Sequence, residues 1–275
     1  MIGILHPGEM GAAVARCLTQ TGRGVLWAST GRSDATAERA DRAGLVDAVT
    51  VDEHVDRCDV VFSICPPHVA IDIARSVGFG GIFVDGNAVS PATAREIGAI
   101  VRARGASFVD GGIIGPPPGP SAAARLYLSG VNAPTVAQLF DGTPLAAKVV
   151  DDEAGSASAL KMAYAAWTKG TSALLLAIRA VARADGVEEA LLREWETSLP
   201  ELAAQSVRAC GSATNKGWRW VTEMEQIAAT FADAGLPDGF LLAAAEVYRR
   251  TPRGDGSAPD TDTLDTVLQR LRAAE

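Results

Sequence analysis

The amino-terminal stretch MIGILHPGEMG, residues 1–11, decides how the rest of the chain is interpreted. It contains an apolar run, a turn that holds Gly8 and Gly11, and the start of helical spacing. This order is typical of a dinucleotide-binding fingerprint, in which glycines let the backbone approach a pyrophosphate and let helix and strand pack closely. His6 occupies the position of the first glycine. The alternative interpretation is therefore an ordinary strand-to-helix turn.

Short apolar runs alternate with amphipathic segments through the first half of the chain. This βαβα order predicts a parallel sheet with helices on both faces and a ligand site at the carboxyl ends of the strands. The expected strands are residues 1–5, 24–28, 45–51, 59–65, 80–86, 107–115, 124–130 and 146–150. The expected helices are residues 9–21, 34–43, 67–77, 91–104 and 131–142.

Helical patterns fill the second half of the chain. Strand patterns stop at the acidic stretch Asp151–Glu153, so we expect a sheet domain over residues 1–152 and a helical domain over residues 153–275. The expected helices are residues 155–184, 188–210, 217–234, 238–250 and 262–274.

Composition narrows the class of protein. The 275 residues are 48% hydrophobic and carry a formal net charge of -8, which predicts a globular core and argues against nucleic acid or an anionic membrane as partner. The chain shows no secretion signal and no apolar run of spanning length, so a soluble cytoplasmic protein is expected. The scattered cysteines predict neither a metal site nor a disulfide framework.

The residues after the second expected strand indicate the preferred cofactor. An NAD-binding fingerprint is usually followed, about twenty residues on, by an acidic residue for the ribose hydroxyls. Here the sequence has Ser29, Thr30 and Arg32 instead. Hydroxyls and a guanidinium suit a 2'-phosphate, so NADPH is expected over NADH. The alternative is a solvated arginine ahead of a helix cap.

Four segments occur in the order found in the β-hydroxyacid dehydrogenase family, which the chain resembles: Gly8–Gly11, Asp85–Pro91, Phe108–Asp110 and Gly155–Lys161. That family includes 6-phosphogluconate and 3-hydroxyisobutyrate dehydrogenases. The resemblance implies an α/β Rossmann-type N-terminal domain, an all-α C-terminal domain like one of unassigned function in phosphogluconate-dehydrogenase-like proteins, and a homodimer formed through the helical domain. We expect the cofactor to be bound, besides the three residues above, by His6, Pro7, Gly8, Glu9, Met10, Cys65, Pro66 and Asn87.

Lys161 matches the family's general acid/base lysine by its position after Gly155. Its amine would exchange a proton with the oxygen on the carbon that exchanges hydride. Tyr164 and Thr168 follow on the same helical face and are expected to help hold the substrate. The alternative is a solvated surface lysine, against which the apolar neighbours of Lys161 argue.

Two departures from the family bear on the substrate. Ala165 replaces an asparagine, and Ile114 replaces the serine that grips a carboxylate. We therefore expect a bulkier or less polar small molecule that contacts Ile113 and Ile114, with Ser90 close to the nicotinamide.

Trp218 and Arg219 are the candidates in the second half for completing the substrate pocket. The alternative for them is a helix that packs through two indoles. The leading hypothesis is thus an NADPH-dependent oxidoreductase acting on a carbonyl/hydroxyl pair through Lys161. Two alternatives stay open: an imine reductase, which shares this architecture, and a non-catalytic NADP-binding protein in which His6 and Ala165 mark an eroded site.

Overall fold

The computed structural model describes residues 1–254 and 261–272. The last two positions of the expected helix 262–274 lie outside these residues. The chain divides into two compact units, Met1–Met162 and Ala163–Glu275. The division falls inside helix α7 (Ser156–Ala184), after the boundary expected at residues 152 and 153, because the first turns of α7 pack on the sheet of the first unit.

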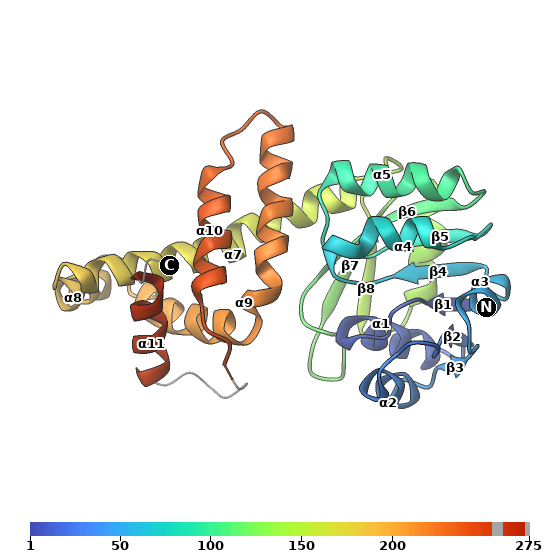
Figure 1. Cartoon of the computed structure of the whole chain (residues 1–275), viewed down its shortest axis with the longest axis horizontal. Coiled ribbons are helices and arrows are strands. Elements are labelled where there is room, and N and C mark those ends of the chain that lie inside the picture. The colour runs from blue at the N-terminus through green and yellow to red at the C-terminus, as the bar shows by residue number, and fades with distance from the viewer. Residues whose placement is uncertain (255–260, 273–275) are drawn as a thin grey trace. The chain divides into compact units, whose positions relative to one another are not determined.

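The first unit is built on an eight-stranded sheet with the strand order β3-β2-β1-β4-β5-β6-β7-β8 (Figure 1). Strands β1 to β6 pair in parallel, β7 runs antiparallel to β6, and β8 is parallel to β7. This is the α/β architecture that the sequence predicts. The strand order reverses between β1 and β4, which is where such sheets bind ligands. The strands are β1 Ile2–Ile4, β2 Val25–Trp27, β3 Val46–Asp47, β4 Val60–Ser63, β5 Ile82–Asp85, β6 Ser107–Ile114, β7 Ala124–Ser129 and β8 Leu145–Val149.

Helices cover both faces of the sheet (Figure 1). One apolar cluster packs α1 residues such as Val14 and Leu18 on β1 and β4, and a second packs α4 and α5 on the other face. The clusters are separate because successive strand residues point to opposite faces. The helices are α1 Glu9–Thr19, α2 Asp34–Arg42, α3 Val51–Asp56, α4 Ala70–Ser76, α5 Pro91–Arg102 and α6 Ala133–Ala137, with 3-10 turns η1 Pro67–Val69 and η2 Gln138–Phe140.

The strand expected over residues 45–51 is too long, since β3 ends at Asp47 and α3 begins at Val51. The physical reason is a helix cap. The Thr50 side chain accepts a hydrogen bond from the backbone N–H of Glu53 at 3.2 Å, and that bond satisfies a donor of the first turn.

The second unit consists of the rest of α7 with α8 Glu188–Ser198, α9 Leu202–Asp233, α10 Gly239–Arg250 and α11 Thr261–Arg272. The helices expected over 188–210 and 217–234 have the wrong boundaries, because the chain leaves the helix after Ser198 and not between residues 210 and 217. The break comes at Pro200, which cannot donate a helical hydrogen bond and restricts Leu199. α9 continues through Gly217, where a Cβ would already stand 3.3 Å from the Tyr248 ring of α10. That glycine serves close packing instead of beginning a helix.

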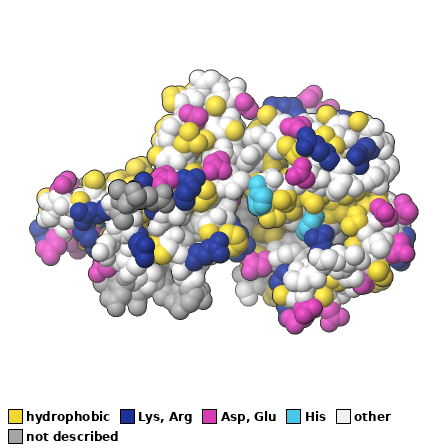
Figure 2. All heavy atoms as spheres, viewed as in Figure 1, with side chains coloured by type: hydrophobic (Ala, Val, Ile, Leu, Met, Phe, Trp, Pro, Cys, Tyr) yellow, Lys and Arg dark blue, Asp and Glu magenta, His cyan; other side chains and the backbone are white. Residues whose placement is uncertain are grey.

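No helix within the described ranges is both long and apolar enough to cross a membrane. On the face shown in Figure 2, Lys and Arg side chains of the described residues lie in several separate groups, with Asp and Glu side chains between them.

Candidate functional site

The turn between β1 and α1, residues 5–8, is called the fingerprint turn below, and it leads directly into α1. Gly8 precedes the helix, and its carbonyl accepts from the Ala12 N–H at 2.8 Å. A side chain at Gly11 would collide with the His6 carbonyl oxygen, so this position requires glycine. Among the described residues nothing lies within 4 Å of a Cβ built on Gly8. The space beside Gly8 is therefore open, as the close approach of an anion to the start of α1 requires.

His6 brings a neutral imidazole to this turn. Burial, and after it the charge of Arg32, lowers the pKa of His6 to about 4. Its Nδ1 atom is buried and has no hydrogen-bond partner among the residues that the structure describes. Because buried nitrogens are normally hydrogen-bonded, this orphaned atom suits a polar group of a bound molecule.

Arg32 lies beside the same turn. Its Nη2 donates to the Leu5 carbonyl at 3.1 Å, and its backbone N–H donates to the Ser29 carbonyl at 3.0 Å. Asp47, which the sequence reasoning missed, accepts from the N–H groups of Ser29 and Val49 at 3.2 and 2.8 Å. The pairing of β2 with β3 brings this carboxylate next to the loop, and only knowledge of that pairing could have revealed it.

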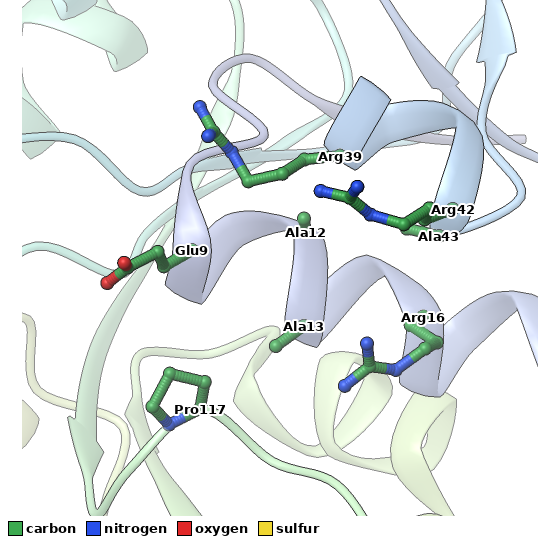
Figure 3. A pocket seen from close by; sticks show the side chains of 8 residues that line it. All are labelled: Glu9, Ala12, Ala13, Arg16, Arg39, Arg42, Ala43 and Pro117. Carbon is green, nitrogen blue, oxygen red and sulfur yellow. The ribbon is translucent and has the colours of Figure 1, made fainter. Parts of the chain in front are cut away.

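A basic pocket of about 420 Å³ lies between α1 and α2 (Figure 3). Arg39 Nε donates to the Pro7 carbonyl at 3.3 Å and so ties α2 to the fingerprint turn, while Arg16 Nη2 donates to the Pro118 carbonyl at 2.9 Å. The residues that line the pocket are Glu9, Ala12, Ala13, Arg16, Arg39, Arg42, Ala43 and Pro117.

Four buried polar residues form a row across β4 to β7: Ser63, Asp85 and Ser129 end their strands, and Asp110 lies in the middle of β6. Strand register pairs Ser63 with Asp85, Asp85 with Asp110, and Asp110 with Ser129. All four side chains are at most 1% exposed. The sequence reasoning missed this polar row, although three of its members end an apolar strand pattern. That repeated placement is the signal that could have found it.

Asn87 joins the β4 and β5 part of the row. Its side-chain amide donates to Asp85 Oδ1 and to Ser63 Oγ, and its Oδ1 accepts from the Cys65 N–H at 2.6 Å. Burial, followed by the neighbouring Asp85 charge, raises the pKa of Cys65 to about 12. The Cys65 thiol is therefore protonated at neutral pH and is no nucleophile.

Asp110 holds the start of α7. Its carboxylate accepts from the Ser158 N–H at 2.8 Å, from Ser158 Oγ at 2.6 Å and from Ser129 Oγ at 3.2 Å. Ser129 Oγ in turn accepts from the Ala157 N–H at 3.1 Å. A negative charge at a helix N-terminus is also favoured by the helix dipole. These bonds fix the first turn of α7 on the sheet.

Lys161 stands two turns into this anchored helix and is partly buried. A Cβ on Gly112 would lie 3.1 Å from the Cβ of Lys161 and 2.8 Å from the carbonyl oxygen of Ala157, so Gly112 lets α7 approach β6 closely. Gly112 shares a sheet face with Asp110 and, through strand register, with Asp85. The Lys161 charge acts on the pKa of Asp85 in the lowering direction.

The remaining site candidates of the first unit differ in burial and in the face of the sheet on which they lie. Ile113 belongs to the core cluster on the α1 side, whereas Ile114 shares the face of Gly112. Ser90 is buried and caps α5, where its Oγ accepts from the Thr93 N–H at 3.2 Å. Thr30 and Pro66 are exposed.

The four second-unit candidates lie on α7 and α9. Tyr164 is 48% exposed, and Thr168 lines a cavity of about 250 Å³ between these two helices. The Trp218 ring lies 5.2 and 4.4 Å from the guanidinium carbons of Arg219 and Arg253. No group of three or more His, Cys, Asp or Glu side chains in the described part of the chain could hold a metal ion.

A reversing parallel sheet with a glycine turn after β1 defines a nucleotide-binding protein of the Rossmann type. The chain belongs to the β-hydroxyacid dehydrogenase family: residues 1–139 match the NAD binding domain of 6-phosphogluconate dehydrogenase. Residues 182–251 match a domain of unknown function, DUF1932. The first unit is thus a nicotinamide-cofactor-binding domain.

Two similar proteins have no assigned function. An uncharacterized 28.5 kDa protein from Methanothermus fervidus is 33% identical over 169 residues, which span 60% of this chain and 64% of that protein. A conserved protein of unknown function with structural similarity to 3-hydroxyacid dehydrogenases is 27% identical, covers 99% of both chains and has a TM-score of 0.69.

Two solved enzymes share the fold at lower identity. Mycobacterium tuberculosis 3-hydroxyisobutyrate dehydrogenase, solved with L-serine, is 18% identical with 99% of both chains covered and a TM-score of 0.72. An imine reductase variant from Myxococcus stipitatus, in complex with NAD+, is 22% identical with 98% of both chains covered and a TM-score of 0.59.

Proposed function

We propose that this protein is an NADPH-dependent oxidoreductase that exchanges hydride between the nicotinamide and the carbonyl or hydroxyl carbon of a small molecule. The observation that carries the proposal is the position of Lys161, which stands on an anchored helix over Gly112, beside the end of the sheet. The family supports a nicotinamide cofactor, and the retained lysine supports chemistry at an oxygen.

The residues of the first unit fit such a cofactor. The open turn at Gly8 and the start of α1 would hold the pyrophosphate, and Arg32 would hold the 2'-phosphate. Asn87 and the backbone at Cys65 would lie along the nicotinamide end. When bound, the cofactor supplies the hydride, and the protein supplies binding, orientation and a proton.

Lys161 Nζ would give a proton to the substrate oxygen during reduction and take it back during oxidation. Partial burial of the side chain limits competing water at the amine. Asp110 contributes by keeping the first turns of α7, and with them Lys161, in place.

A C=N substrate is the second candidate function. The end of β6 presents Ile114, which is 6% exposed, in place of a hydroxyl that would grip a carboxylate. An apolar side chain there suits an imine without an acid group. Imine reductases share the fold, as the Myxococcus stipitatus structure illustrates.

The second unit is proposed to form the homodimer interface and to supply substrate contacts through Tyr164, Thr168, Trp218 and Arg219. On α7, Trp167, Leu174 and Val181 recur every seven residues and are 72, 59 and 62% exposed. An exposed apolar stripe with this spacing is typical of a helix that packs on another helix. Sedimentation velocity of the wild type and of Leu174→Lys tests the dimer.

The decisive experiment measures cofactor binding separately from turnover. NADPH and NADH are titrated against intrinsic tryptophan fluorescence, and a panel of carbonyls and imines is then offered at saturating NADPH. We expect tighter NADPH binding and reduction of at least one class. Binding without turnover across the panel would favour a non-catalytic cofactor-binding protein, and absence of binding would overturn the proposal.

A further inference from the structure

The two carboxylates of the polar row are hydrogen-bonded very differently. Asp110 accepts from Ser158 N–H, Ser158 Oγ and Ser129 Oγ. Asp85 accepts from the Asn87 amide at Oδ1, but its buried Oδ2 has no hydrogen-bond partner within the described residues. Burial raises the pKa of Asp110 too, but its three donors favour its charged form, whereas Asp85 Oδ2 has no donor among the described residues and can hold a proton.

The pKa of Asp85 agrees with this difference in hydrogen bonding. Burial, and after it the charge of Asp110, raises the pKa of Asp85 to about 7, against the Asn87 hydrogen bonds and the Lys161 charge. Two adjacent buried carboxylates do not ionise together easily. We expect Asp85 to be the member of the pair that titrates near neutral pH, because Asp110 has three hydrogen-bond donors that favour its charge and Asp85 Oδ2 has none among the described residues.

Lys161 is the cation whose charge acts on Asp85. Its Cβ stands over Gly112, on the sheet face that Asp85 and Asp110 share. A further titratable group close to Asp85 is the Cys65 thiol, two residues after β4, on whose pKa the Asp85 charge acts in the raising direction and Arg32 in the lowering direction. Helix α7 contributes Lys161, and β6 contributes Asp110.

We propose that Asp85 is a positioning residue for Lys161, whose carboxylate draws the ammonium toward the end of β5 and whose protonation releases it for proton transfer. The catalytic meaning rests on the function proposed above, but the electrostatic coupling does not. When Asp85 holds its proton, Lys161 is the stronger acid and delivers its proton more readily. When Asp85 is ionised, Lys161 keeps its proton.

The coupling can be measured without a substrate, because the chain has only four lysines: Lys148, Lys161, Lys169 and Lys216. Protein labelled with ¹³C and ¹⁵N at lysine is titrated by NMR, and Lys161→Arg assigns the Lys161 signal. In the wild type, the Lys161 side-chain signal should show a step near pH 7 that reports Asp85. In Asp85→Asn the step should vanish, and the pKa of Lys161 should fall by at least about one unit.

Ser63→Ala is the matched control, because it alters the same polar row without removing a charge, and it should keep the step. A Lys161 titration unchanged by Asp85→Asn would overturn the proposal. If that variant does not fold, the wild type decides, since a Lys161 signal without a step near pH 7 also overturns it. Failure to bind NADPH would overturn the proposed oxidoreductase function, but the NMR titration would still test the coupling of Asp85 to Lys161.

Discussion

Gly112 and Lys161 face each other across β6 and α7, where a Cβ on the glycine would stand 3.1 Å from the Cβ of the lysine. The same atom would lie 2.8 Å from the Ala157 carbonyl, which belongs to a helix that Asp110 and Ser129 hold in place. The helix therefore cannot move away without breaking buried hydrogen bonds.

Gly112→Ala should accordingly lower the free energy of unfolding by about 1–3 kcal/mol, as overpacking does. Urea unfolding measures the change. Gly78→Ala is the control, because no described atom lies within 4 Å of its added Cβ, and it should change stability by less than about 0.5 kcal/mol. Equal stability of the two variants would mean that α7 is not pressed against β6.

Lys161→Met should reduce turnover by roughly 10²-fold or more, because the general acid/base is lost, and should leave NADPH affinity nearly unchanged. Steady-state kinetics and a fluorescence titration separate the two quantities. Lys148→Met, at an exposed site on β8, should behave like the wild type. A Lys161→Met rate close to that of Lys148→Met would remove the lysine from the mechanism.

Arg32→Ala should weaken NADPH binding by about tenfold or more and NADH binding much less, because only NADPH offers a 2'-phosphate to the guanidinium. The dissociation constants of both cofactors should be compared with those of Arg57→Ala, which removes an exposed arginine after α3. Equal losses for the two cofactors would show that Arg32 supports the turn only through its bond to the Leu5 carbonyl.

Asp85→Asn should change how stability depends on pH. The folded-state pKa of Asp85 is raised to about 7 from 3.8, so the folded protein binds the extra proton. Its stabilising effect is complete below pH 3.8 and is lost as the pH rises through about 7. Between about pH 5 and 8 the wild type should therefore lose roughly 2–3 kcal/mol relative to Asp85→Asn.

Urea unfolding at both pH values checks this difference. Asp56→Asn, at an exposed site at the end of α3, should run parallel to the wild type over the same range. Parallel curves for Asp85→Asn as well would show that Asp85 is not protonated in the folded state.

The parallel sheet and the glycine turn were predictable from the sequence because both depend on local periodicity and on glycine geometry. The cap at Thr50 and the break at Pro200 also depend on local sequence, although the surrounding patterns predicted a longer strand and a longer helix. The packing role of Gly217 depends on the contact of α9 with Tyr248 of α10. Asp47 beside Ser29 could not be predicted, since their contact depends on which strands become neighbours.

In the candidate site, too, some residues were predictable from the sequence and others were not. His6, Gly8 and Lys161 could be singled out by their places in the chain, and the structure puts them in one unit. The partnership of Asp85 with Asp110 needed the sheet register, because their sequence positions say nothing about lateral pairing.

The polar row also ties neighbouring elements together in two groups, one that joins β4 with β5 and one that joins β6, β7 and the start of α7. Asn87 bridges β4 and β5, and the Asp110 and Ser129 side chains bridge β6, β7 and α7. Opening any one member of a group exposes buried polar partners on the others. The amide protons within each group should therefore exchange with solvent slowly and together, while those of the edge strand β3 exchange independently.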